Sequence, residues 1–94
     1  MVIQVVCMKE TFRKSLGEAV QQRRRELGLT QDELAYRSEL HRTYISDVER
    51  GTRNVSLDTL LQMSKGLGIS LSTLFIEAER RAKAAAGGDD PAKR

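Results

Sequence analysis

Apolar residues recur every three or four positions along most of the chain, and glycines divide its middle into short segments. This spacing places the apolar side chains on one face of a helix, so it predicts helices rather than strands. We expect five helices, at about residues 12–27, 30–38, 42–50, 56–67 and 70–79. The apolar stretch VIQVV at residues 2–6 stays open between a strand, a disordered extension and an arm that packs on a partner.

Local signals indicate where these helices begin and end. Thr30 stands three residues before Glu33, a spacing in which each side chain can bond the other's free backbone N–H group to form a capping box. Ser56 and Ser70 are in position to cap the two helices that follow them. Gly51 marks the end of the third helix, because glycine readily adopts the left-handed conformation of a helix end.

Length and composition restrict the class of protein. A chain of 94 residues with 39% apolar and 31% charged residues suits one soluble helical domain. No stretch approaches the ~20 apolar residues that span a bilayer, so we expect no membrane partner. Cys7 is the only cysteine, which excludes an internal disulfide and a cysteine-based zinc site. We therefore expect a cytoplasmic protein with no metal and no cofactor.

The chain divides into three parts by composition. Residues 1–10 are expected to be an N-terminal extension, and residues 11–79 the folded domain. Residues 80–94 are expected to be a flexible basic tail, because they contain no core-forming residue larger than alanine. The formal net charge of +3 permits binding to DNA without requiring it.

Residues 31–50, with the sequence QDELAYRSELHRTYISDVER, combine two short helices with a tight turn. The positions that pack between these helices are small or apolar, namely Leu34, Ala35, Ser38, Leu40, Ile45 and Val48. The intervening positions are polar and are expected to face outward, namely Gln31, His41, Arg42, Thr43, Tyr44 and Asp47. This is the layout of a helix-turn-helix, whose second helix enters the major groove of DNA.

The same stretch resembles the Cro/C1-type, phage-repressor-like helix-turn-helix family. The segments that carry the resemblance are GLTQDELA at 28–35, YIS at 44–46 and VERG at 48–51. Within the family, RTYISDVERGTRN at 42–54 is most similar to the controller proteins of restriction–modification systems. The resemblance covers roughly residues 12–76, and it implies an all-α, five-helix fold like that of lambda repressor.

The resemblance implies a role for individual residues. Those expected to reach base edges are Arg42, Thr43 and Arg53. Those expected to contact the sugar–phosphate backbone are Gln31, Tyr44, Ser46, Thr52 and Asn54. Arg24 and Glu49 match positions that form an internal ion pair in the family. Arginine suits guanine because its guanidinium can donate to both O6 and N7.

Two positions depart from the family pattern. The turn carries Glu39 where glycine is usual, and a non-glycine residue in the left-handed conformation costs about 1 kcal/mol. The cap of the third helix is His41 where serine or aspartate is usual. A neutral imidazole nitrogen can accept a hydrogen bond there, whereas a protonated one cannot.

A single recognition helix buries too little surface for tight specific binding. We therefore expect a homodimer that places two such helices in successive major grooves, about 34 Å apart, on a palindromic operator in double-stranded DNA. The residues expected to form the dimer interface are Leu67, Ile69, Leu71, Leu74, Phe75 and Ala78. That patch has no obvious partner within the chain.

The function expected from these observations is autoregulatory transcription control of a restriction–modification-type operon. Activation would require contact with RNA polymerase, for which Asp32, Glu33 and Glu39 are the candidate acidic surface. Two alternatives stay open, namely a phage- or antitoxin-type repressor of the same fold and a protein-interaction module without specific DNA binding. An enzyme is not expected, because the carboxylates are interleaved with core and cap positions and there is no glycine-rich phosphate loop.

Overall fold

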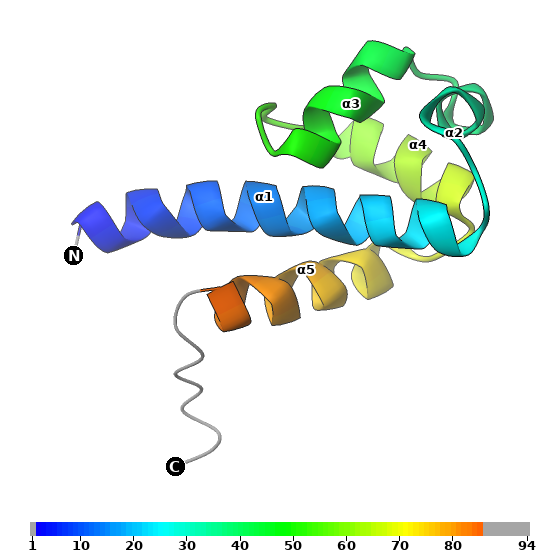
Figure 1. Ribbon diagram of the computed structural model, residues 1–94. Coiled ribbons are helices and arrows are strands. Elements are labelled where there is room, and N and C mark those ends of the chain that lie inside the picture. The colour runs from blue at the N-terminus through cyan, green and yellow to red at the C-terminus, as the bar shows by residue number, and fades with distance from the viewer. Residues whose placement is uncertain (1, 86–94) are drawn as a thin grey trace.

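The computed structural model describes residues 2–85, which form an all-α fold with no strand in that range (Figure 1). The helices are α1 (Val2–Glu26), α2 (Gln31–Ser38), α3 (Arg42–Arg50), α4 (Leu57–Leu67) and α5 (Leu71–Ala85). The bounds of α2, α3 and α4 agree closely with the prediction because their caps are local. Thr30 forms the expected capping box, Ser56 accepts from the backbone of α4, and Gly51 adopts φ 75° at the end of α3.

The first helix begins at Val2 rather than near Phe12, which corrects the prediction for the N-terminal segment. Residues 2–10, expected to belong to a separate extension, continue α1 as helix. The β-branched run at 2–6 has the composition of a strand. However, a helix that has already formed gains one hydrogen bond for each residue added, so it can propagate through residues of modest helix propensity.

The last helix also extends further than expected. α5 continues past Arg80 to Ala85, so the first part of the segment expected to be a flexible tail is helical. Alanine has the most favourable helix propensity, and three alanines occur among residues 82–85. The remainder of the expected tail, residues 86–94, lies outside the described residues.

The long first helix occupies the centre of the domain. Figure 1 shows α5 along one side of α1 and the group of α2, α3 and α4 on the other. α1 packs most extensively against α5 and next against α3, while α2 packs against both α3 and α4. The helix-turn-helix formed by α2 and α3 is therefore held from behind by α1 and α4.

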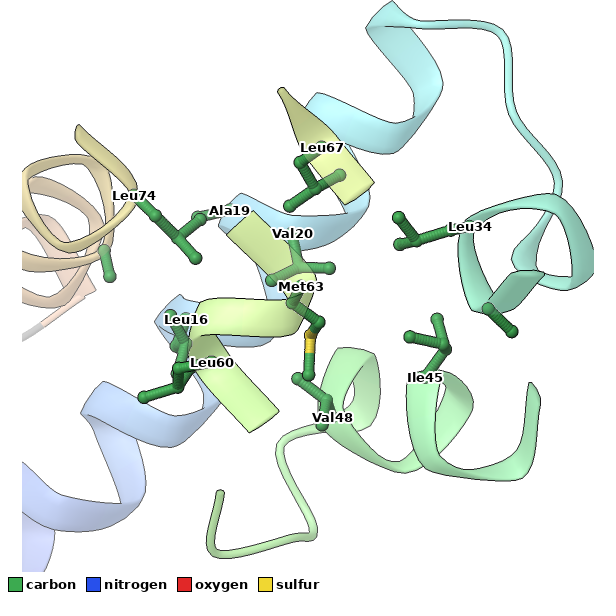
Figure 2. Close-up of a cluster of buried hydrophobic side chains, with 12 residues drawn as sticks. Leu16, Ala19, Val20, Leu34, Ile45, Val48, Leu60, Met63, Leu67 and Leu74 are labelled. Carbon is green, nitrogen blue, oxygen red and sulfur yellow. The ribbon is translucent and has the colours of Figure 1, made fainter. Parts of the chain in front are cut away.

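Every helix contributes to one apolar core (Figure 2). Its buried members are Leu16, Ala19, Val20, Leu34, Ala35, Ile45, Val48, Leu60, Met63, Leu67, Leu74 and Ala78. Burying a leucine, isoleucine or methionine side chain contributes about 1.5–3 kcal/mol, so this cluster is the main stabilising feature of the fold.

Three members of this core correct the prediction for the dimer interface. Leu67, Leu74 and Ala78 are 0%, 1% and 0% exposed within the single chain, so they have no surface to offer a second protomer. The expectation that the whole patch lacked an internal partner was wrong for these three residues. Leu74 and Ala78 lie on α5, which packs against α1, whereas Leu67 ends α4 and is buried within the shared apolar core.

Two glycines allow helices to approach closely. A Cβ atom added at Gly17 would lie 2.3 Å from the backbone oxygen of Val48 and 2.6 Å from that of Glu49, so α1 and α3 touch there backbone to backbone. A Cβ atom at Gly66 would lie 2.2 Å from Oγ of Ser38, which marks the crossing of α4 and α2. Neither close approach was predicted from the sequence, which indicates for Gly66 only a loosened end of the fourth helix.

Candidate nucleic-acid interface

The turn between α2 and α3 has the geometry of a helix-turn-helix. Glu39 adopts φ 58° and ψ 41°, the left-handed conformation expected at the position where relatives carry glycine. Its N–H group donates to the backbone oxygens of Ala35 and Tyr36, which ends α2. His41 then takes an extended conformation and α3 begins, but no hydrogen bond from the imidazole caps that helix. The side-chain cap considered for His41 is therefore absent.

A buried ion pair fixes α3 against α1. Arg24 donates to both carboxylate oxygens of Glu49, from Nε at 2.7 Å and from Nη2 at 3.0 Å. The two side chains are only 11% and 2% exposed. The hydrogen bond that Arg24 donates to Glu49 raises the pKa of Arg24, and burial opposes this shift only in part. The expected pair of Arg24 and Glu49 is thus present in bidentate form, which combines charge with fixed geometry.

Further polar contacts tie the same ion pair to the start of α2. Arg24 Nη1 donates to the backbone oxygen of Leu29 at 2.9 Å. Gln31 Nε2 donates to Oε1 of Glu49 at 3.0 Å. One N–H of the Gln31 amide is therefore used inside the protein, so this residue links α2 to α3 as well as standing where a phosphate contact is predicted. The predicted phosphate contact itself remains a prediction.

The first turn of α3 presents its predicted base-reading residues to solvent. Arg42 and Thr43 are exposed, whereas the next core position, Ile45, is fully buried. Arg42 Nε lies 3.3 Å from Oδ1 of Asp32 on α2, in an ion pair whose side chains are 64% and 75% exposed. A guanidinium in so open a pair can exchange its partner readily, because solvent screens the attraction.

Arg42 lies at the start of α3. Two further arginines, Arg50 and Arg53, lie at the end of α3 and in the loop after it. The guanidinium of Arg53 stacks on the ring of Tyr44, with Cζ 4.3 Å from the ring centroid. Arg53 Nη2 also donates to Oδ2 of Asp47 at 2.9 Å. The other oxygen of Asp47 accepts from Arg50, which in turn donates to Oγ of Ser46 at 2.6 Å. The predicted residues Tyr44, Ser46 and Arg53 are thus linked, directly or through their neighbours, by one carboxylate.

The remaining predicted backbone contacts lie in the same loop. Thr52 and Asn54 are exposed. Oγ1 of Thr52 donates to the backbone oxygen of Asp47 at 3.1 Å, which fixes the direction in which the loop leaves α3. The surface therefore carries arginine donors at both ends of α3, with exposed hydroxyl and amide groups nearby. Such a set suits the acceptor edges of bases and the oxygens of phosphates.

Sequence reasoning missed the roles of Asp32 and Asp47 in this surface. Asp47 was treated only as an outward-facing polar position, and Asp32 only as part of an acidic patch. The spacing of Asp47 and Arg50, three residues apart on one helix, was the available signal for an ion pair. No local spacing indicates the contacts of Asp47 with Arg53 or of Asp32 with Arg42, because each pair lies across a turn.

Fold, turn geometry and exposed arginines together define a helix-turn-helix DNA-binding protein. Residues 20–74 match the helix-turn-helix family, and the chain belongs to the Cro/C1-type branch of these DNA-binding transcription regulators. Among its relatives is the control protein C.BamHI of Bacillus amyloliquefaciens. The two are 49% identical over 69 residues, which cover 72% of this chain and 85% of that protein.

Solved structures show the same fold in two kinds of regulator. The restriction–modification controller protein C.AhdI from Aeromonas hydrophila is 39% identical with a TM-score of 0.64, over 65% of this chain and 92% of its own. The clp gene regulator ClgR from Corynebacterium glutamicum is 34% identical with a TM-score of 0.77, over 87% of each chain. In residues 2–85 no helix has the length and apolar character needed to cross a membrane.

Proposed function

We propose that this protein is a dimeric, sequence-specific transcription regulator that controls its own gene and a restriction–modification-type operon, and that it is not an enzyme. The observation that carries the proposal is the exposed set of Arg42, Thr43 and Arg53 on a helix-turn-helix fixed by a buried ion pair. Similarity to control proteins, at up to 49% identity, supports the operon assignment.

The base contacts follow from the position of each side chain. Arg42 and Thr43 reach base edges from the first turn of α3, and Arg53 reads a base from the following loop. Phosphate and sugar contacts come from Gln31, Tyr44, Ser46, Thr52 and Asn54. Arg42 leaves Asp32 when it meets a guanine, since the exposed ion pair is weaker than a bidentate contact with O6 and N7.

Dimerisation is part of the proposal because one α3 helix cannot supply operator affinity alone. Two copies related by a two-fold axis place their α3 helices about 34 Å apart on a palindromic operator. The interface retains the partly buried Ile69, Leu71 and Phe75 from the original prediction. It gains the exposed apolar side chains Leu57, Leu61 and Ile76, which are 62%, 49% and 55% exposed.

Regulation then depends on which operator is occupied. One bound dimer activates transcription through RNA polymerase, and a second dimer represses it. The candidate polymerase contact is the exposed acidic surface at α2, formed by Asp32, Glu33 and Glu39. Pairing of Arg42 with DNA leaves the carboxylate of Asp32 free to join that surface.

The test of the DNA-binding proposal is footprinting on the DNA upstream of the gene, titrated across salt. We expect a protected inverted repeat, an affinity that falls steeply with salt, and loss of protection in Arg42→Ala. Arg80→Ala is the matched control, because it removes an exposed arginine on α5 without touching the helix-turn-helix. Equal loss in both variants would contradict base reading by Arg42.

The test of the interface is sedimentation of Leu61→Glu and of Lys65→Glu. Both substitutions place a carboxylate on exposed positions of α4, but only the first removes an apolar side chain. We expect Leu61→Glu to sediment as a monomer and Lys65→Glu as a dimer, with circular dichroism unchanged in both. If the Leu61→Glu variant still sediments as a dimer, the interface lies elsewhere on the protein.

The alternative assignment within the same class is regulation of genes other than a restriction–modification operon. The observation that favours it is the alignment with ClgR, which covers 87% of this chain against 65% for C.AhdI. A phage- or antitoxin-type repressor is a second alternative, and an operator beside a prophage or toxin gene would support it. A pure protein-interaction module predicts no operator and no effect of Arg42→Ala.

A further inference from the structure

We propose that Asp47 is a positioning residue that sets the discrimination of this protein between its operator and unrelated DNA, acting through Arg53. The inference rests on the proposed DNA-reading role of Arg53. Asp47 lies on α3, and its carboxylate accepts from both Arg50 and Arg53 at the end of that helix and in the loop after it. None of its interactions is required to complete the apolar core.

The geometry of Asp47 fixes Arg53 from two directions. The carboxylate accepts from Arg53 Nη2 at 2.9 Å, while the backbone oxygen of Asp47 accepts from both N and Oγ1 of Thr52 at 3.1 Å. One residue therefore orients the loop and the side chain that the loop carries. Tyr44 supplies the third constraint, because the guanidinium rests on its ring at 4.3 Å from the centroid.

Arg53 keeps its capacity to read DNA while it is held in this way. An arginine side chain has five N–H donors, and the contact with Asp47 uses one nitrogen. The side chain of Arg53 is 41% exposed, against 19% for Asp47, so the remaining donors can face a ligand. An arginine already fixed in one conformation loses less entropy when it forms a bidentate contact.

The negative charge of Asp47 has a second effect, on all DNA sequences alike. A carboxylate on the recognition helix repels nearby phosphates, which lowers affinity for any duplex. At the operator this repulsion is offset because Arg53 is placed correctly for its base, whereas unrelated DNA offers no such base. Arg53 held in one conformation favours the operator, and the repulsion weakens binding to all DNA. Together they increase the difference between the affinities for the operator and for unrelated DNA.

The experiment compares Asp47→Asn with the wild type on two duplexes. The operator is first recovered by selecting wild-type binders from random DNA, and an unrelated duplex of equal length serves as the second ligand. We expect Asp47→Asn to bind unrelated DNA more tightly and the operator less tightly. The ratio of the two affinities should fall about tenfold, the discrimination that one bidentate base contact supplies.

Glu77→Gln is the matched control, since Glu77 also accepts from two arginines, Arg80 and Arg81, but lies on α5. It removes the same charge and should leave the ratio unchanged. Thermal unfolding of each variant verifies that the fold is intact. If Asp47→Asn does not fold, Asp47→Ser replaces it in the same measurement.

A double-mutant cycle separates positioning from simple repulsion. In the Arg53→Ala background, Asp47→Asn should cause no further loss of discrimination, because Asp47 acts through the missing side chain. A parallel rise in affinity for both duplexes, or an unchanged ratio, would overturn the proposal. If selection enriches no sequence, this proposal and the proposed function fail together. If it enriches a sequence absent upstream of the gene, only autoregulation fails.

Discussion

Arg24 and Glu49 join α1 to α3 with side chains that are 11% and 2% exposed, whereas Arg42 and Asp32 join α3 to α2 with side chains that are 64% and 75% exposed. The functional groups are the same in the two pairs. The buried pair is bidentate, and its carboxylate also accepts from Gln31. The exposed pair is held by a single 3.3 Å contact.

This contrast shows how one helix can be held rigidly on one face and carry an exchangeable side chain on the other. Taking an ion pair out of water makes its separation costly, so the buried pair has one arrangement. An exposed pair is screened and gains little, so its arginine remains available to a stronger partner. α3 thus presents a movable arginine from a fixed position.

The largest expected effect comes from breaking the buried pair. Arg24→Ala leaves the carboxylate of Glu49 without its main partner, and we expect the free energy of unfolding to fall by about 3–5 kcal/mol in urea denaturation. Arg25→Ala, an exposed neighbour on α1, should change it by less than about 0.5 kcal/mol. Because the hydrogen bond to Glu49 raises the pKa of Arg24, the loss should be constant from neutral pH to moderately alkaline pH. Equal losses of stability in Arg24→Ala and Arg25→Ala would show that the buried ion pair contributes no more to folding than an exposed arginine does.

A smaller effect is expected from separating the helices that carry the buried pair. Gly17→Ala forces a Cβ atom against the backbone oxygens of Val48 and Glu49, so α3 must move away from α1. We expect a loss of about 1–3 kcal/mol in thermal unfolding, as in other overpacked contacts. Gln22→Ala, an exposed substitution on the same helix, is the control. A fully stable Gly17→Ala protein would show that the helix crossing is not as close as described.

The exposed pair should contribute little to folding and a modest amount to binding. Asp32→Asn should change the free energy of unfolding by less than about 0.5 kcal/mol. It should tighten operator binding by at most about fivefold, because Arg42 no longer has to leave a carboxylate. Fluorescence anisotropy on the operator measures the second effect. Weaker binding in this variant would mean that Asp32 orients Arg42 rather than competing for it.

The smallest expected changes are those caused by salt, which should affect the exposed ion pair but not the buried one. Raising ionic strength from about 0.05 to 0.2 M roughly halves the screening length, which reduces the effect of Asp32→Asn on operator binding. The stability loss in Arg24→Ala should change by less than about 0.5 kcal/mol over the same range, because its environment excludes ions. Fluorescence anisotropy on the operator measures the first change and urea denaturation the second, each at both salt concentrations.

Local signals explain why the sequence predicted the helix-turn-helix well. Thr30, Ser56 and Gly51 fix helix ends through contacts within a few residues, so no knowledge of the tertiary structure is needed. Glu39 was placed in the left-handed turn by comparison with the family, and its φ of 58° agrees. The ion pair of Arg24 and Glu49 was predicted from the same comparison with the family.

Features that depend on packing between helices distant in the sequence could not be predicted from the sequence alone. Leu67 and Leu74 have the same apolar pattern whether they pack inside the chain or against a second chain, so the pattern alone does not separate core from dimer interface. The extent of α1 was missed because the run at residues 2–6 carries no cap signal and has a strand-like composition. Asp47 was overlooked because its contact with Arg53 depends on where the loop turns.

The pairing of α1 with α5 determines when the helix-turn-helix gains its full support. These helices stand at opposite ends of the described chain, yet they form its most extensive contact, with Ala19 directed toward Leu74 in Figure 2. During translation α1, α2 and α3 are synthesised before α5, so the helix-turn-helix is made before its support is complete. A chain that lacks α5 leaves one side of α1 uncovered. The helix-turn-helix is therefore fully supported only once synthesis has reached the last helix.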